Sequence, residues 1–252
     1  MKLLYTALRY DYMDPRRGLS FEHYNFYDTF AKMSEFQITY FPYDHILEMG
    51  KEKFNEELLA LVKKERPDVL FAVMFTDELD KKILDEIKRY TTSIAWMCDD
   101  HWRFDNYSKY YAPHFSWVAT TYSEAVKEYK KIGQQNVIHT QWAANVNTYH
   151  PSGDKMNVGV SFIGSWNKER VRIIRFLDSV GIRADVWGSG WPNGRIGQRE
   201  MVELISRSKI SLGLNPPSSY FGMKPLARLF LRRSGNMIIP DFWNLFSNLR
   251  EW

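Results

Sequence analysis

The chain has 252 residues, of which 44% are hydrophobic and 25% are charged, a mixture that indicates a folded globular protein and excludes a disordered one. Its formal net charge is +4, and the charges are interspersed along the sequence. Such a balance suits an anionic small ligand as well as nucleic acid, but because no single element concentrates the cations, we expect no nucleic-acid partner.

The sequence contains no sign of export or of membrane insertion. The single cysteine, Cys98, excludes an internal disulfide and suits a reducing compartment. The apolar run after Met1 is too short for a signal peptide, and no stretch approaches the ~20 apolar residues of a membrane span. We therefore expect a cytoplasmic protein.

Strands and helices alternate through residues 1–150, which we predict to form one domain. Apolar runs predict strands at residues 2–8, 37–41, 69–74, 93–98, 117–120 and 137–140. Between them, helices are predicted at residues 20–33, 51–65, 79–87 and 123–132; the second of these carries Phe54, Leu58, Leu61 and Val62 at helical spacing. This alternation implies right-handed βαβ units and a mostly parallel sheet.

A turn-forming linker at residues 151–154 interrupts the pattern, which then restarts. Strands are predicted at residues 158–163, 184–187 and 210–214, and helices at 168–180 and 198–207. The first helix places Ile173, Phe176, Leu177 and Val180 on one face, which we expect to be buried. The fold class is therefore α/β, with a second Rossmann-like domain over residues 155–252 that is short of strands and incomplete.

An apolar strand ends directly in Asp99, Asp100 and His101. Ligands of open α/β sheets bind outside the carboxyl ends of the strands, and titratable clusters there are candidates for chemistry. These three residues are therefore candidate catalytic groups. The alternative is that Asp99 or Asp100 caps the following turn or helix.

The strand at residues 158–163 leads into Gly164, Ser165, Lys168 and Arg170. Unpaired backbone N–H groups at the start of a helix, beside two cations, favour a phosphate or diphosphate. The alternative is a tight turn with solvated charges.

Small residues follow the next two strands. Gly188 and Gly190 fail the dinucleotide fingerprint because Pro192 and Asn193 interrupt it, but glycine also permits close approach of a ligand. Asn215 and Ser218 follow the last predicted strand and complete the candidate donor site.

The loop between the first strand and the first helix carries Arg16, Arg17 and Gly18. It is longer than the ~2–6 residues usual in such turns, so it is a candidate for contact with an acceptor or a phosphate, and a solvated loop is the alternative. No metal is predicted, because the six histidines lack metal-ligand spacing and adjacent carboxylates rarely face one ion.

Residues 145–151, Asn-Val-Asn-Thr-Tyr-His-Pro, resemble the linker of GT-B glycosyltransferases of the group-1/family-4 kind, with Asn147 where an aspartate is usual. Longer stretches resemble the CgeB-like (spore maturation protein) branch of these enzymes: residues 17–27, 98–104, 141–144 and 187–194. The resemblance covers most of residues 1–219.

The resemblance implies two Rossmann-like domains across a cleft, with a nucleotide-sugar donor on the C-terminal domain, an acceptor on the N-terminal one, and no metal or other cofactor. Lys168 and Arg170 would stabilise the departing diphosphate. His101, Asp99 or Asp100 would accept or orient the acceptor's proton. The alternative is a non-catalytic binding or assembly protein of the same fold. The sugar, the nucleotide, the acceptor and the stereochemistry stay open.

The Glu-x7-Glu region that grips the donor in this family is not found after Ser218, so either the chain is a fragment or its donor domain has decayed. The tail is instead too apolar to stay solvated, and we expect it to pack on the first domain, on a second copy or on a missing segment. Its apolar residues are Leu226, Leu229, Phe230, Met237, Ile238, Ile239, Phe242, Trp243, Leu245, Phe246 and Trp252. Arg228, Arg232 and Arg233 would also permit peripheral contact with anionic lipid.

Overall fold

A computed structural model describes residues 1–151, 153, 155–215, 227, 229–242, 245 and 249. The chain forms two compact units. The first unit combines Met1–Ala143 with Tyr220–Trp252, and the second is Ala144–Ser219. Among the residues named above, Ser218, Leu226, Arg228, Trp243, Phe246 and Trp252 lie outside the described part.

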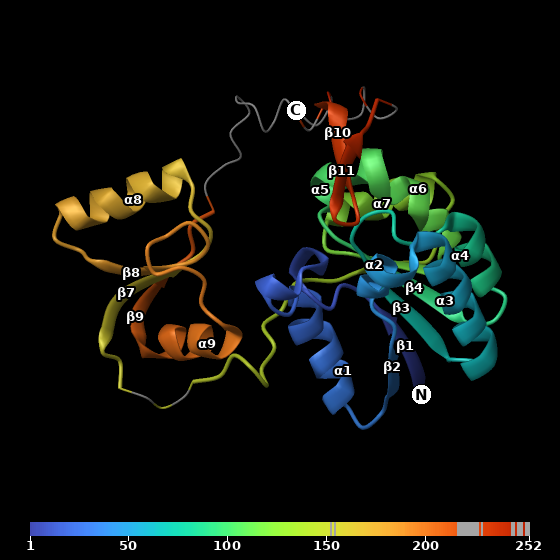
Figure 1. The fold of residues 1–252 in the computed structure, drawn as a ribbon, viewed down its shortest axis with the longest axis horizontal. Coiled ribbons are helices and arrows are strands. Elements are labelled where there is room, and N and C mark those ends of the chain that lie inside the picture. Colours follow the sequence, from blue (N-terminus) through green and yellow to red (C-terminus); the bar gives the residue numbers. More distant parts are fainter. Residues whose placement is uncertain are drawn as a thin grey trace. The chain divides into compact units, whose positions relative to one another are not determined.

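The first unit is built on a six-stranded parallel sheet (Figure 1). Its strands stand in the order β2-β1-β3-β4-β5-β6, with bounds β2 Gln37–Tyr40, β1 Lys2–Thr6, β3 Val69–Met74, β4 Thr92–Met97, β5 Trp117–Thr120 and β6 Val137–His139. All six strands are predicted from the apolar runs, with ends that differ by at most two residues, so this part of the fold class is confirmed.

One face of this sheet is covered by three helices: α3 (Lys51–Glu65), α4 (Lys81–Ile87) and α7 (Ser123–Lys131). Phe54, Leu58 and Val62 of α3 are completely buried, as their helical spacing predicts. Burying each such side chain contributes about 1.5–3 kcal/mol. This face therefore holds the main core of the unit.

The opposite face is covered by a π-helical turn, His23–Tyr27, and by α1, Asp28–Lys32. Ser20 starts this segment as predicted, because its Oγ accepts a hydrogen bond from the His23 backbone N–H at 3.0 Å. The packing on this face is aromatic: Tyr5 on β1 lies against the rings of Tyr27, Phe30, Tyr40 and Phe71.

The order in which successive strands are added to the sheet reverses at β1, because β2 lies on one side of β1 and β3 on the other. Loops leaving the carboxyl ends of neighbouring strands at such a reversal diverge, and the crevice between them is where open α/β sheets bind ligands. In this unit, the loops in question follow Thr6 and Met74.

A C-terminal hairpin, β10 (Leu231–Ser234) and β11 (Met237–Pro240), belongs to the first unit and is drawn in red in Figure 1. Ser234 Oγ donates to Asp77 Oδ1 at 2.6 Å, and the Gly235 backbone N–H donates to Thr76 Oγ1 at 2.8 Å. Because the polar partners of the hairpin follow β3, the described tail lies with the first unit, whereas the sequence places residues up to 252 in the second domain.

The hairpin leaves several apolar side chains open to solvent, namely Met237, Ile238 and Phe242. Self-association through the tail and contact with lipid both remain predictions. Within the described residues, no helix is both long and apolar enough to cross a membrane.

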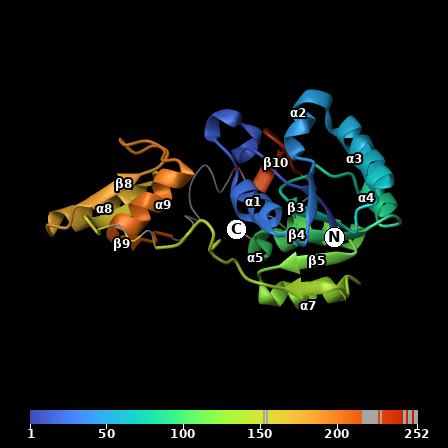
Figure 2. The same ribbon diagram turned by 90° about the horizontal axis from the view of Figure 1, so that it is seen from below.

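The second unit is a parallel sheet in the order β8-β7-β9, with bounds β8 Ala184–Trp187, β7 Val158–Ile163 and β9 Ser208–Leu212. Its helices are α8 (Lys168–Ser179) and α9 (Gln198–Arg207), shown with their strands in Figure 2. Two units on parallel sheets confirm the predicted α/β class with two Rossmann-like units.

The predicted apolar face of α8 is buried only in part. Ile173 and Leu177 are half-buried, whereas Phe176 and Val180 are 64% and 55% exposed. The half-buried side of the helix also carries Arg170, whose guanidinium donates to the Leu214 carbonyl. Apolar periodicity does not register this polar contact.

Candidate functional site

Asp99 lies in the left-handed region of backbone space, at φ 61°, directly after β4. It precedes the short helix α5 (Asp100–Arg103), but its exposed side chain makes no capping hydrogen bond. Its backbone carbonyl instead accepts from the N–H groups of Trp102 and Arg103. The Asp99 carboxylate is thus directed to solvent and open to a ligand.

Asp100 is only 3% exposed and lies in a buried network. Its Oδ2 accepts hydrogen bonds from Thr120 Oγ1 at 2.6 Å and from the Tyr129 hydroxyl at 2.8 Å. Burial, reinforced by the Asp100 carboxylate, raises the pKa of Tyr129, so that this phenol stays protonated and donates. Asp100 Oδ2 therefore joins the end of β4 to β5 and α7.

His101 is exposed, and its ring lies 6.2 Å from that of Tyr122. Two residues further on, Arg103 donates to the Phe75 carbonyl at 2.6 Å and stacks over Tyr107 at 4.0 Å. Arg103 thus fastens the loop after β4 to the loop after β3. The structure separates the three predicted catalytic residues: His101 and Asp99 are accessible, and Asp100 is buried.

The basic loop after β1 is closed on itself. The Asp11 backbone N–H donates to the Gly18 carbonyl at 3.0 Å, and Gly18 has φ 84°, a conformation that favours glycine. Arg16 pairs with Asp14 through two nitrogens, each at 2.9 Å, and the Arg17 guanidinium approaches Asp11 to 2.7 Å. These pairs fix where the two arginines stand.

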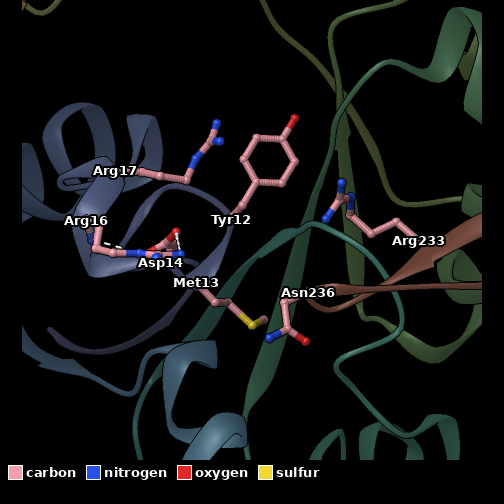
Figure 3. A pocket seen from close by; sticks show the side chains of 7 residues that line it. All are labelled: Tyr12, Met13, Asp14, Arg16, Arg17, Arg233 and Asn236. Atoms are coloured by element: carbon pink, nitrogen blue, oxygen red, sulfur yellow. Dashed lines mark hydrogen bonds and ion pairs between the residues drawn. The ribbon is translucent and has the colours of Figure 1, made fainter. Parts of the chain in front are cut away.

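This loop and the hairpin line an open pocket of about 620 Å³, near the point between β1 and β3 where the strand order reverses (Figure 3). The guanidinium carbons of Arg17 and Arg233 each lie 4.7 Å from the centroid of the Tyr12 ring, which Figure 3 shows between them. The ring also packs edge-on against Phe75 at 5.6 Å. We call this open pocket the arginine pocket; it is lined by Tyr12, Met13, Asp14, Arg16, Arg17, Arg233 and Asn236.

Of the seven lining residues, only Arg16 and Arg17 belong to the sites predicted from sequence; the other five are Tyr12, Met13, Asp14, Arg233 and Asn236. One signal could have found the hairpin: Gly235-Asn236 is a pair typical of a two-residue hairpin turn, and an apolar run follows it at residues 237–239. Nothing in the sequence pairs that hairpin with a loop near the N-terminus, because the pairing depends on polar contacts to the loop after β3.

The glycines of the second unit bring two loops together. A Cβ on Gly188 would lie 2.0 Å from the Gly164 carbonyl oxygen, and a Cβ on Gly190 would lie 2.8 Å from the Trp166 side chain. Trp191 Nε1 also donates to the Gly164 carbonyl at 2.9 Å. Contact between loops therefore explains why glycine occupies these positions, without a ligand.

The two predicted phosphate-binding cations of this unit differ in their surroundings. Arg170 donates to the Leu214 carbonyl at 3.0 and 3.1 Å, to the Ser165 carbonyl at 2.7 Å and to Ser165 Oγ at 3.1 Å. Lys168 is exposed and has no ion-pair partner in the described part of the chain. It lines a hollow of about 360 Å³ together with Trp166, Val171, Arg172 and Arg175.

The remaining candidates add little to the site. Asn215 is exposed after β9. Cys98 is not poised as a nucleophile, because burial raises the pKa of its thiol to about 12. Within the described ranges, no group of three or more His, Cys, Asp or Glu side chains is arranged to hold a metal ion.

No protein-family profile matches the sequence, and no curated protein matches it. Among solved structures, the chain is similar to UDP-GlcNAc 2-epimerase from Neisseria meningitidis bound to UDP-GlcNAc, with 10% identity over 84% of this chain and 77% of that one, at a TM-score of 0.46. It is also similar to S. aureus MnaA with UDP, with 8% identity over 85% and 69% of the two chains, at a TM-score of 0.44.

A third likeness is to the glycosylation-associated protein complex Gap123 from Streptococcus agalactiae, with 8% identity and a TM-score of 0.38. It covers 64% of this chain but only 37% of the other chain. All three scores lie below 0.5, so the function proposed below rests on the residues of this chain.

Proposed function

We propose that this protein binds a nucleotide sugar and transfers its sugar to an acceptor, as its resemblance to CgeB-like glycosyltransferases implies. The observation that carries the proposal is the arginine pocket, which lies at the carboxyl ends of β1 and β3 where the sheet order reverses. That is the general ligand position of open α/β sheets, and its guanidinium groups suit the anionic ligands of such a reaction.

The donor is assigned to the second unit. Lys168 opens α8, a helix of twelve residues, and its ammonium group is open to solvent. A cation beside the positive end of a helix dipole suits a diphosphate. Arg170 has a positioning role in this proposal, because it holds the Gly164–Ser165 turn against the end of β9 through Ser165 and Leu214.

The acceptor is assigned to the first unit, with His101 as the group that takes its proton. An imidazole can accept a proton from an attacking hydroxyl when the two are in hydrogen-bond reach. The ring of His101 is exposed at the carboxyl edge of the sheet, whereas Asp100 is held by Thr120 and Tyr129.

A second candidate function is binding without turnover, as in an assembly protein of the same fold. It is favoured by the structural bonds of Asp100 and Arg170, two of the residues that the resemblance places in the reaction. Fold by itself does not supply activity.

Release of nucleoside diphosphate distinguishes the two functions. The chain is incubated with UDP- and GDP-linked hexoses, with and without a mixture of phosphorylated and neutral sugars as acceptors, and free UDP or GDP is measured. We expect release that His101→Ala abolishes while Trp117→Phe, a change on an exposed strand position of the same unit, retains it. Nucleotide binding without release would instead establish the non-catalytic function.

A further inference from the structure

We infer that the arginine pocket is a phosphate site in which the C-terminal hairpin supplies the decisive cation, Arg233. In the transfer reaction proposed above, on which this role rests, the phosphate belongs to the acceptor. The acceptor class is then a phosphate monoester or a diphosphate, such as a sugar phosphate.

The three arginines of the pocket differ in whether a carboxylate of the protein already pairs with them. Arg16 and Arg17 are paired with Asp14 and Asp11. Arg233 is half-buried and makes no ion pair with any carboxylate that the structure describes. A half-buried guanidinium without a counter-ion gains most from an incoming anion.

The hairpin directs its two adjacent arginines to opposite sides, as successive residues of a strand require. Arg232 forms an ion pair with Asp77 at 3.3 Å. Lys51 and Ser234 contact the same carboxylate. Arg233 turns the other way and lies over Tyr12. The anchoring cation and the ligand-binding cation are therefore separate residues.

The guanidinium carbon of Arg233 lies over the Tyr12 ring, 4.7 Å from its centroid. Stacking on a ring uses the face of the guanidinium and leaves its N–H edges for a bidentate contact with phosphate oxygens. Tyr12 is itself held by a left-handed backbone, at φ 56°, and by Phe75. Asn236, at the hairpin turn, adds an amide that can donate to the same ligand.

The size and polarity of the pocket agree with such a ligand. Its volume of about 620 Å³ falls within the ~300–1,000 Å³ usual for small-molecule sites. The lining side chains are mainly charged and amide-bearing, which suits a phosphorylated sugar better than an apolar acceptor.

The test is calorimetric titration of the whole chain with inorganic pyrophosphate, using Arg233→Gln and, as a matched control on the same unit, Arg89→Gln, whose arginine pairs with Glu86. We expect Arg233→Gln to weaken pyrophosphate binding about tenfold or more, and Arg89→Gln to leave it unchanged. Hydrogen exchange of residues 231–240 verifies that the hairpin of the Arg233→Gln variant stays docked. Equal pyrophosphate affinity in the wild type and in a docked Arg233→Gln variant would overturn the phosphate site.

Titration with UDP separates the two sources of phosphate. Unchanged UDP affinity in Arg233→Gln, with weakened pyrophosphate affinity, supports a phosphate carried by the acceptor. An equal loss for UDP keeps the phosphate site but overturns the acceptor assignment in favour of the donor. Pyrophosphate binding that depends on Arg233, in a chain that neither binds nor cleaves any nucleotide sugar, supports the phosphate site while the proposed transfer function fails.

Discussion

Ser234 Oγ donates a hydrogen bond of 2.6 Å to Asp77 Oδ1 and thereby joins the C-terminal hairpin to the loop after β3. The Asp77 carboxylate also forms ion pairs with Lys51 at 3.5 Å and with Arg232 at 3.3 Å. Asp77 is therefore the anchor on which the position of the hairpin, and with it that of Arg233, depends.

The anchor should be sensitive to acid. Burial acts to raise the pKa of Asp77, but the Ser234 hydrogen bond and the cations Lys51 and Arg232 outweigh it, and the pKa is lowered overall. A carboxylate with a depressed pKa contributes stability above its unfolded pKa, about 3.9, and that contribution is lost as the pH falls through the lower folded value. We expect the protection of residues 231–240, measured as the exchange rate relative to the intrinsic rate at the same pH, to fall below about pH 4.

The variant Asp77→Asn should show fast exchange of the hairpin already at neutral pH, since it removes the charge that holds Lys51 and Arg232. The control is Asp85→Asn, an exposed aspartate paired with His114. Protection of the hairpin that is identical in Asp77→Asn and in the wild type would mean that another contact holds it.

The neighbouring aspartates after β4 offer a matched pair of substitutions. Asp100→Asn replaces a buried charged acceptor of two hydrogen bonds, and we expect it to lower the free energy of unfolding by about 1–3 kcal/mol. Asp99→Asn changes an exposed residue and keeps a side chain that tolerates φ 61°, so its effect should stay within about 0.5 kcal/mol. Chemical denaturation measures both, and equal effects would refute the structural role of Asp100.

Arg170 should stabilise the second unit by positioning its loops. Arg170→Lys keeps the charge but cannot reproduce the simultaneous contacts with the Ser165 and Leu214 carbonyls. We expect a loss of about 1–3 kcal/mol in the free energy of unfolding, with faster hydrogen exchange in β7 and β9. Arg172→Lys, on the exposed side of the same helix, is the control, and similar losses in the two variants would contradict the anchoring role.

Close approach of two loops predicts that Gly188 tolerates no side chain. In Gly188→Ala the new Cβ would meet the Gly164 carbonyl oxygen, at a backbone φ of 137° that also disfavours alanine. We expect a loss of at least about 3 kcal/mol in stability. Gly159→Ala on β7 has no heavy atom within 4 Å of the added Cβ, so it should be neutral or stabilise by about 0.5 kcal/mol. Thermal unfolding of the two variants compares them directly.

The regular elements of both units could be predicted from sequence because their apolar spacing reflects burial directly. Phe54, Leu58 and Val62 mark α3, and the run at residues 69–74 marks β3. The exposure of Phe176 and Val180 on α8 and the polar contact from Arg170 to Leu214 could not be predicted in this way, since apolar spacing registers neither.

Only those residues of the candidate site that lie close together in the sequence could be predicted. Arg16, Arg17 and Gly18 stand out as a long basic loop, and they line or adjoin the arginine pocket. Arg233 comes from the other end of the chain, and only the tertiary contacts of the hairpin bring it to Tyr12. Asp100 and His101 are adjacent in sequence, yet only the fold reveals that one is buried and the other exposed.

The most direct test of the central claim, binding of a nucleotide sugar, is calorimetric titration of the chain with UDP and GDP. The variants are Lys168→Ala and, as a control, Arg183→Ala, a cation of the second unit that is 94% exposed. We predict that one of the two nucleotides binds the wild type and the Arg183→Ala variant equally, and binds Lys168→Ala about tenfold more weakly, as loss of a charged contact to phosphate requires. Absence of binding by the wild type, or equal affinity in all three proteins, would contradict the proposed donor site.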